Sequence, residues 1–277
     1  MQERLLQWMR ENDRNLPWRG ETDPYKIWVS EIMLQQTRAE AVKPYYARFL
    51  AAFPHVRALA EAPLDAVYKH WEGLGYYSRA RNLHRAAQEI VTKYDGNLPR
   101  TRDALMTLPG IGAYAAGAIA SIAFGERVPA LDGNQARVLS RLYCIDAPLK
   151  SPADLYPLAL SLVPESAPGD YNQALMDLGA LICLPKNPRC EACPLSALCA
   201  AHREGREREL PRKPPKADKR RERRGVAIVL SGGCALVRRR PETGLLAGLY
   251  EFPNFLDACD AASLTECLEE AGLSVRP

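Results

Sequence analysis

The chain has 277 residues, 47% of them hydrophobic and 25% charged, which is typical of a globular protein with room for two domains. It has no apolar run of the about 18 residues that a membrane span needs, so we expect no membrane segment. The net charge of +4 is small but unevenly placed, which indicates a local contact with an anionic partner.

The first 201 residues predict a mostly α fold, because Ala- and Leu-rich windows with a spacing of about 3.6 residues alternate with short turns. Residues Met1–Arg10 have an amphipathic helical pattern without the apolar centre of a signal peptide. The further predicted helices are Tyr25–Gln36, Leu64–Trp71, Ser78–Tyr94, Arg102–Thr107, Ala113–Phe124 and Gln135–Tyr143.

A short turn with two glycines joins the predicted helices Arg102–Thr107 and Ala113–Phe124. Pro109, Gly110, Ile111 and Gly112 stand between two helical patterns and predict a helix-hairpin-helix turn. The glycines allow a tight turn, and the free N–H groups at the start of the next helix can bind a phosphate without reading base sequence. Taken alone, this turn is a signal of modest specificity for DNA binding.

Four cysteines follow within 17 residues: Cys183, Cys190, Cys193 and Cys199. Sets of thiolates select zinc or an iron–sulfur cluster. Zinc ribbons usually contain two C-x2-C pairs, whereas this loop has one pair with wider gaps on both sides. The spacing therefore favours one [4Fe–4S] cluster over zinc, and it predicts a reducing compartment, the cytoplasm or nucleoid.

The positive charge is concentrated directly after this loop. Residues 202–224 hold 11 basic and 5 acidic side chains and several prolines, so we predict a basic linker that lies along an anionic partner. Residues 225–277 read as the opening of an α+β domain that is cut short, because about 53 residues rarely bury a stable core. Its predicted strands and helix are Val226–Leu230, Ala235–Arg239, Leu249–Phe252 and Ser263–Ala271.

The hairpin together with the cysteine spacing resembles the endonuclease III superfamily of DNA base-excision glycosylases. Further segments are similar to the adenine DNA glycosylase (MutY) branch of that superfamily, and this resemblance is dense over about residues 3–200. These segments are Leu16–Arg19, Ser30–Thr37, Trp71–Tyr77, Leu131–Asn134 and Asn172–Gly179.

The resemblance implies a domain organisation. Residues 1–201 correspond to a helix-hairpin-helix glycosylase core of two helical subdomains, with the iron–sulfur loop at 183–199. Residues 202–224 correspond to an interdomain linker. Residues 225–277 are similar to the start of a Nudix-like recognition domain, and they lack the acidic Nudix box, so we expect no nucleotide hydrolysis. The resemblance implies that the recognition hairpin of that domain, on which the discrimination of 8-oxoguanine from guanine largely depends, lies beyond position 277.

Two carboxylates could perform the cleavage of an N-glycosidic bond, which needs an acid and a group that stabilises a sugar cation. Glu31 lies in an apolar run that should raise its pKa, although a helix-surface glutamate would give the same pattern. Asp132 precedes a helix and is an ordinary N-cap candidate whose charged form the helix terminus favours. The resemblance makes Glu31 the acid for N7 of adenine, Asp132 the cation stabiliser, and Asn134 a positioning group for Asp132 or water.

The bifunctional branch of the superfamily carries a Schiff-base lysine two residues after the second hairpin glycine. Tyr114 stands there in this chain, and a phenol cannot form an imine. The resemblance therefore implies a monofunctional enzyme that leaves an abasic site, with Tyr114 hydrogen-bonded near Asp132. The alternatives are a bifunctional endonuclease III-like glycosylase/AP lyase and a non-catalytic iron–sulfur DNA-binding module.

The implied substrate is adenine mispaired with 8-oxoguanine or guanine, which must leave the base stack before it can react. The implied partner is double-stranded DNA with a flipped adenine, bound by a monomer. The resemblance assigns the binding of the flipped base to Trp18, Arg19 and Gln173. It assigns the filling of the vacated stack to Gln36 and Tyr76, with Leu34 beside them.

Overall fold

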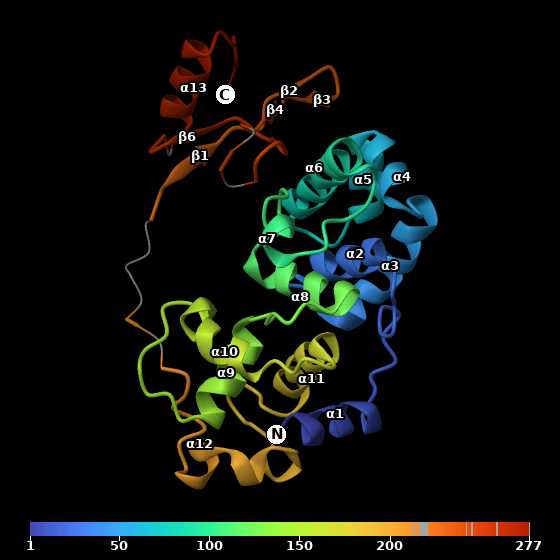
Figure 1. The fold of residues 1–277 in the computed structure, drawn as a ribbon. Coiled ribbons are helices and arrows are strands. Elements are labelled where there is room, and N and C mark those ends of the chain that lie inside the picture. Colours follow the sequence, from blue (N-terminus) through green and yellow to red (C-terminus); the bar gives the residue numbers. More distant parts are fainter. Residues whose placement is uncertain (213, 216–220, 242, 245, 259, 277) are drawn as a thin grey trace. The chain divides into compact units, whose positions relative to one another are not determined.

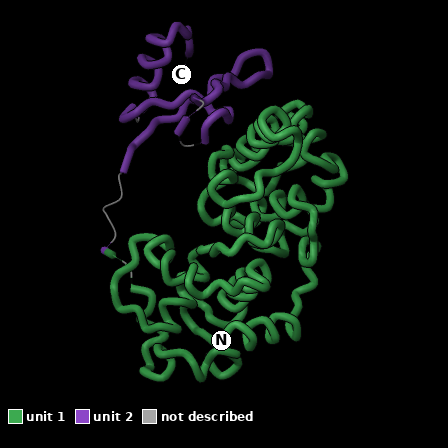
Figure 2. The backbone as a smooth tube through the Cα atoms, viewed as in Figure 1, with its two compact units in different colours: residues 1–214 green, residues 215–277 purple. Residues whose placement is uncertain are grey.

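The computed structural model describes all residues except 213, 216–220, 242, 245, 259 and 277. The chain divides into two units, Met1–Pro214 and Pro215–Pro277 (Figure 2). The first unit is built almost entirely of helices (Figure 1). Within the described part of the chain, no helix is long and apolar enough to cross a membrane.

The mostly α prediction for the first unit is confirmed, and each predicted helix is present with ends that differ by at most two residues. Its α-helices are α1 (Gln2–Glu11), α2 (Pro24–Leu34), α3 (Ala39–Ala52), α4 (Val56–Glu61), α5 (Leu64–Trp71), α6 (Tyr77–Tyr94), α7 (Arg102–Leu105), α8 (Ala113–Phe124), α9 (Gly133–Leu142), α10 (Tyr156–Leu162), α11 (Pro168–Leu181) and α12 (Ala200–Arg203). Short 3-10 helices are η1 (Pro152–Leu155), η2 (Cys190–Ala192) and η3 (Ser196–Leu198).

Helices α2 to α8 form one subdomain around a continuous apolar core. Helix α2 runs through its centre, and eight of its eleven residues are buried. A helix that is apolar on all sides needs neighbours on all sides, which here include α3, α6 and α8. Asp23 fixes the start of α2 by accepting a hydrogen bond from the Tyr25 N–H at 2.9 Å, and Pro24 is favourable at the first helical position.

The second subdomain combines the N-terminal helix with the later part of the unit. Helix α1 packs against α11, and its buried Leu5 lies in one apolar cluster with Tyr171 and Leu195. The Gln2 side chain donates a hydrogen bond to the Leu162 carbonyl at 2.7 Å. Both ends of the first unit therefore lie in the second subdomain, and the other subdomain is formed by the continuous segment α2 to α8.

The second unit contains three short antiparallel ladders and one helix. Its elements are β1 (Arg224–Val226) paired with β6 (Asn254–Leu256), β2 (Leu230–Ser231) paired with β3 (Cys234–Ala235), β4 (Arg238–Arg239) paired with β5 (Tyr250–Glu251), and α13 (Ala261–Glu270). The predicted hairpin turn is present, because Gly232 and Gly233 have φ angles of 57° and 79° and suit a two-residue turn. The strands are shorter than predicted, and residue 226 pairs with the segment 254–256 instead of joining that hairpin.

The predicted linker is only partly described, because residues 213 and 216–220 lie outside the described residues. Residues 202–212 belong to the first unit. Leu210 is buried there, and the Leu149 N–H donates to the Arg212 carbonyl at 3.0 Å. This segment is thus fastened to the second subdomain by apolar burial as well as by backbone hydrogen bonds.

Helix α8 approaches the backbone at Pro129 closely at Gly117, and a substitution there tests the packing of this helix. A Cβ at this position would lie 2.2 Å from the Pro129 carbonyl oxygen, which is backbone and cannot turn aside. We expect Gly117→Ala to lower the free energy of unfolding by about 1–3 kcal/mol, measured by urea denaturation. Gly112→Ala is the matched control, since its φ is −85° and no atom lies within 4 Å of its Cβ. Equal losses in both variants would contradict this interpretation.

Candidate functional site

A pocket of about 660 Å³ opens between the two helical subdomains of the first unit, within the usual size range of ligand sites. Helix α2 supplies one wall, α11 and the start of α9 supply another, and the segment between α1 and α2 closes a third side. The lining residues are Arg14, Leu16, Trp18, Arg19, Glu31, Leu34, Thr37, Arg38, Ala39, Glu40, Asn134, Gln173, Met176, Asp177 and Ala180.

Glu31 is the carboxyl group that α2 contributes to this pocket, and it is almost fully buried. Burial raises the pKa of Glu31 to about 7 by disfavouring the charged form. The Tyr114 hydroxyl donates a hydrogen bond to Glu31 Oε2 at 2.9 Å and opposes this rise in pKa, whereas the charge of Asp132 adds to it. The expectation for Glu31 therefore holds, and Tyr114 hydrogen-bonds Glu31 itself, where we expected a bond near Asp132.

Asp132 is the N-cap of α9, as its position in the sequence indicates. Its Oδ1 accepts the Gln135 N–H at 2.7 Å, and its Oδ2 accepts the Asn134 side-chain amide at 2.8 Å. Burial nevertheless raises the pKa of Asp132 above its ordinary value, although these hydrogen bonds and the Arg137 charge lower it. The net direction is opposite to the one expected from the helix terminus alone, because desolvation outweighs the N–H donors.

Arg137 connects this carboxylate to the cysteine loop. Its Nη2 donates to Asn134 Oδ1 at 2.9 Å, and its Nε donates to the Cys183 carbonyl at 2.8 Å. Asp132, Asn134, Arg137 and Cys183 thus form a continuous hydrogen-bonded series along the first turns of α9. A change in the backbone at Cys183 would alter the amide that holds Asp132.

A second polar cluster lies on the α11 side of the pocket. Arg19 Nη1 donates to Gln173 Oε1 at 2.7 Å, and Arg19 also pairs with the buried Asp177. Arg14 Nη1 contacts the same carboxylate at 3.0 Å. Trp18 stands edge-on to Tyr46, with ring centroids 5.4 Å apart. Trp18, Arg19 and Gln173 therefore line one pocket together with Glu31.

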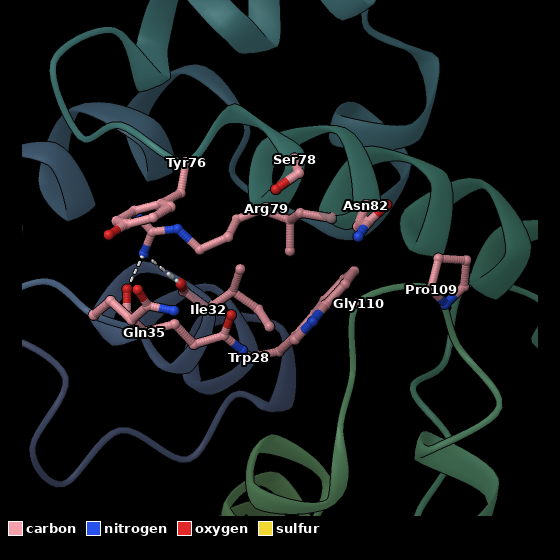
Figure 3. Close-up of a pocket in the computed structure, with 11 residues that line it drawn as sticks. Trp28, Ile32, Gln35, Tyr76, Ser78, Arg79, Asn82, Pro109 and Gly110 are labelled. Atoms are coloured by element: carbon pink, nitrogen blue, oxygen red, sulfur yellow. Dashed lines mark hydrogen bonds between the residues drawn. The ribbon is translucent and has the colours of Figure 1, made fainter. Parts of the chain in front are cut away.

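Gln36 and Tyr76 line a smaller pocket of about 230 Å³. Figure 3 shows Tyr76 there together with Pro109 and Gly110 of the hairpin. Tyr76 exposes 58% of its surface. Leu34, which was predicted beside them, lines the larger pocket with Glu31 instead. The hairpin turn itself is closed by the Ile111 N–H, which donates to the Leu108 carbonyl at 3.2 Å, and Gly112 is the N-cap of α8.

The four cysteines of the loop face one small cavity between the end of α11 and α12, and none is in a disulfide. Burial raises the pKa of Cys190 and of Cys193 to about 11, and the nearby thiols add to this rise. Arg141 Nη1 donates to Cys183 Sγ at 3.3 Å. Four soft sulfur donors around one cavity, with a cation beside them, fit an anionic iron–sulfur cluster.

Comparisons with known proteins agree with this geometry. Residues 29–164 match the family model of the HhH-GPD superfamily base excision DNA repair proteins. An adenine DNA glycosylase of Buchnera aphidicola from Schizaphis graminum is 36% identical over 91% of this chain and 74% of its own length. The chain belongs to the adenine DNA glycosylase family.

The curated relatives from mammals and plants are longer. The human adenine DNA glycosylase is 37% identical over 90% of this chain, and the Arabidopsis thaliana one is 40% identical over 94%. The chain spans 56% and 48% of their lengths. The solved structure of a thermostable thymine-DNA glycosylase matches 73% of this chain and 94% of its own, with a TM-score of 0.68 and 32% identity.

The cysteine loop is an iron–sulfur binding domain of the endonuclease III type, since residues 183–199 match that family model. This confirms the iron–sulfur prediction and argues against the zinc alternative. Cys183, Cys190, Cys193 and Cys199 would hold the cluster, and Arg137 and Arg141 from α9 hold the loop by its backbone.

Three charged residues of the site escaped the sequence reasoning: Asp177, Arg137 and Arg79. Asp177 stands in an apolar helix in the same way as Glu31, and that pattern could have revealed it. The two arginines bind backbone carbonyls far away in the sequence, and no local pattern predicts such partners.

The raised pKa of Glu31 makes stability depend on pH. Its ordinary pKa is 4.5 and its pKa in the folded protein is about 7. The folded state therefore holds the proton more tightly, and stability from this group is full below pH 4.5 and lost as pH rises through about 7. We expect Glu31→Gln to gain stability over the unmodified protein across this window, by up to about 3 kcal/mol in urea unfolding. A difference that stays constant from pH 4.5 to 8 would refute the assignment.

Proposed function

We propose that this chain is a monofunctional DNA glycosylase that hydrolyses the N-glycosidic bond of adenine mispaired with 8-oxoguanine or guanine. The product is an abasic site in double-stranded DNA, and the enzyme acts as a monomer. The observation that carries this proposal is the pairing of Glu31, whose pKa is about 7, with the hydrogen-bonded Asp132 beside a pocket large enough for a purine.

The proposed reaction uses the two carboxyl groups in different protonation states. Glu31 donates its proton to N7 of adenine, the C1′–N9 bond breaks, and its electron pair leaves with the base. The Asp132 carboxylate stabilises the sugar cation that develops, because it remains fixed by Asn134 and Gln135. Water adds at C1′ and gives a proton to the Glu31 carboxylate, which restores the acid. The negative charge of Asp132 also raises the pKa of Glu31, so it supports the protonated state of the acid.

Tyr114 supports the monofunctional assignment. Burial and the neighbouring Glu31 raise the pKa of this phenol well above its ordinary value, so it remains a neutral donor. Its hydroxyl donates a hydrogen bond to Glu31 Oε2, and a phenol has no amine with which to form an imine. Strand cleavage through a Schiff base would need a different residue at this position.

DNA binding is assigned to two groups of side chains and to the backbone of the hairpin. Trp18, Arg19 and Gln173 receive the flipped adenine, and the stack that it vacates is filled by Gln36 and Tyr76. The hairpin from Pro109 to Gly112 binds a phosphate through backbone N–H groups. The four cysteines hold one [4Fe–4S] cluster, which when bound supplies a cross-link of the loop and takes no part in the hydrolysis. Residues 1–201 form the catalytic core, 202–224 the linker, and 225–277 the start of a Nudix-like domain.

The direct test incubates the purified protein with duplexes that carry adenine opposite 8-oxoguanine or opposite guanine. We expect adenine release, with strand breaks only after alkali treatment. Glu31→Gln should bind the same duplex but lower the single-turnover rate by at least about a hundredfold, as general acids do. The matched control is Glu61→Gln, an exposed residue of α4. Strand breaks without alkali, together with borohydride trapping, would show a lyase; binding without adenine release from either duplex would show a non-catalytic module.

The pH dependence of the same rate tests the protonation of Glu31. Because its pKa is about 7, the single-turnover rate should fall as pH rises above that value. Tyr114→Phe removes the hydrogen bond that lowers this pKa, so the falling limb should move to higher pH. An unchanged limb in Tyr114→Phe would mean that another group controls the profile.

A further inference from the structure

Arg79 on α6 is a buried cation that contacts the C-terminal end of α2. Its side chain is 8% exposed. Its Nη1 atom donates to the carbonyls of Ile32 at 3.1 Å and Gln35 at 2.6 Å (Figure 3), and to that of Met33 at 2.8 Å. These carbonyls have no partner in the next helical turn, and they form the negative end of the helix dipole. One guanidinium nitrogen thus caps the helix that carries Glu31.

The other terminal nitrogen binds a second loop. Arg79 Nη2 donates to the carbonyls of Leu74 at 3.2 Å and Gly75 at 3.3 Å, and also to Thr37 Oγ1 at 3.2 Å. The loop after α2 and the loop before α6 are about 40 residues apart in the chain. A single planar side chain therefore fixes the distance between them.

Each of these loops presents a residue in the left-handed region. Gln36 has a φ of 56° and Tyr76 has a φ of 47°, which side chains other than glycine rarely adopt. Tyr76 is the N-cap of α6 but makes no side-chain capping bond. Both residues are exposed, so neither is held in place by burial of its own side chain. The guanidinium of Arg79 also lies over the Tyr76 ring, 5.5 Å from its centroid.

No carboxylate within the described residues pairs with Arg79, which is unusual for a buried arginine. Desolvation lowers the pKa of its guanidinium, and its Nε has no hydrogen-bond partner. Neutral groups compensate the charge: five backbone carbonyls, the Thr37 hydroxyl and the Tyr76 ring. Since those carbonyls belong to the end of α2 and to the two loops that present Gln36 and Tyr76, the burial of the charge fixes the geometry of both loops.

We propose that Arg79 is a positioning residue, which sets Gln36 and Tyr76 as one unit at the rim of the small pocket so that both enter the duplex together. This inference rests on the proposed function, because it concerns residues assigned there to the DNA stack. Lysine cannot replace the arginine, since a single ammonium has no planar fork and cannot bridge both sets of carbonyls. The side chain acts through Gln36 and Tyr76 and does not touch the reacting bond.

The test is a double-mutant cycle on binding to a duplex with an uncleavable abasic analogue opposite 8-oxoguanine. Arg79→Lys should weaken binding about tenfold in the otherwise unmodified chain, a size common for directly coupled residues. In the Gln36→Ala/Tyr76→Ala background, the same change should weaken binding less than about twofold, because the residues that it positions are gone. Thermal unfolding should shift equally in both backgrounds.

The matched control is Arg127→Lys, since Arg127 also donates to backbone carbonyls, at Val163 and Leu160, away from both pockets. It should leave binding unchanged in either background. Should Arg79→Lys fail to fold, Arg79→Gln removes the buried charge and serves in the same cycle. Equal losses of binding in both backgrounds would overturn the proposal and leave Arg79 a residue of the fold alone. Adenine release by the unmodified protein is measured first, so a failure of the proposed function is recognised separately.

Discussion

The burial of one carboxylic acid in a helix that is apolar on all sides is the constraint on which this structure depends. Glu31 cannot be surrounded by core residues as a bare anion without a large free-energy cost, so it must keep its proton or find donors. The pocket on one side of α2 and the Tyr114 hydroxyl on another relieve that cost only in part. The remaining cost appears as the raised pKa, which is the property that proton donation near neutrality needs.

Hydrogen bonds to backbone carbonyls connect the distant parts of the first unit. Arg137 and Arg141 on α9 bind carbonyls of the cysteine loop, and Arg79 on α6 binds the end of α2. A carbonyl partner fixes the main chain itself, whereas a surface ion pair fixes only two flexible side chains. Each of these arginines therefore fixes the position of a loop. The two carboxylates of the site lie near the helix ends involved, Glu31 in the last turn of α2 and Asp132 at the start of α9.

Local chemistry predicted most of the fold and much of the candidate site. The apolar spacing gave the helices, Asp132 was recognisable as an N-cap, and the four cysteines indicated a cluster from their spacing. The contacts that the sequence did not predict join residues far apart in the chain: the partner of Tyr114 lies 83 residues away at Glu31, and the partners of Arg79 at the end of α2 lie 44 to 47 residues away. The prediction for the pKa of Asp132 failed for a related reason. The sequence shows that Asp132 stands at a helix terminus, but it does not show the burial that raises the pKa.

The position of α1 has a consequence for the synthesis of the chain. Its apolar face, with Leu5 and Trp8, packs on α11 and the cysteine loop, which are made more than 150 residues later. At a rate of about 5–20 residues per second, this face leaves the ribosome roughly 10–40 s before its partners are complete. Helices α2 to α8 can collapse on their own core in that interval. Helix α1 is therefore the segment of this unit that a chaperone would meet uncovered, and the cysteine loop completes the surface that finally covers it.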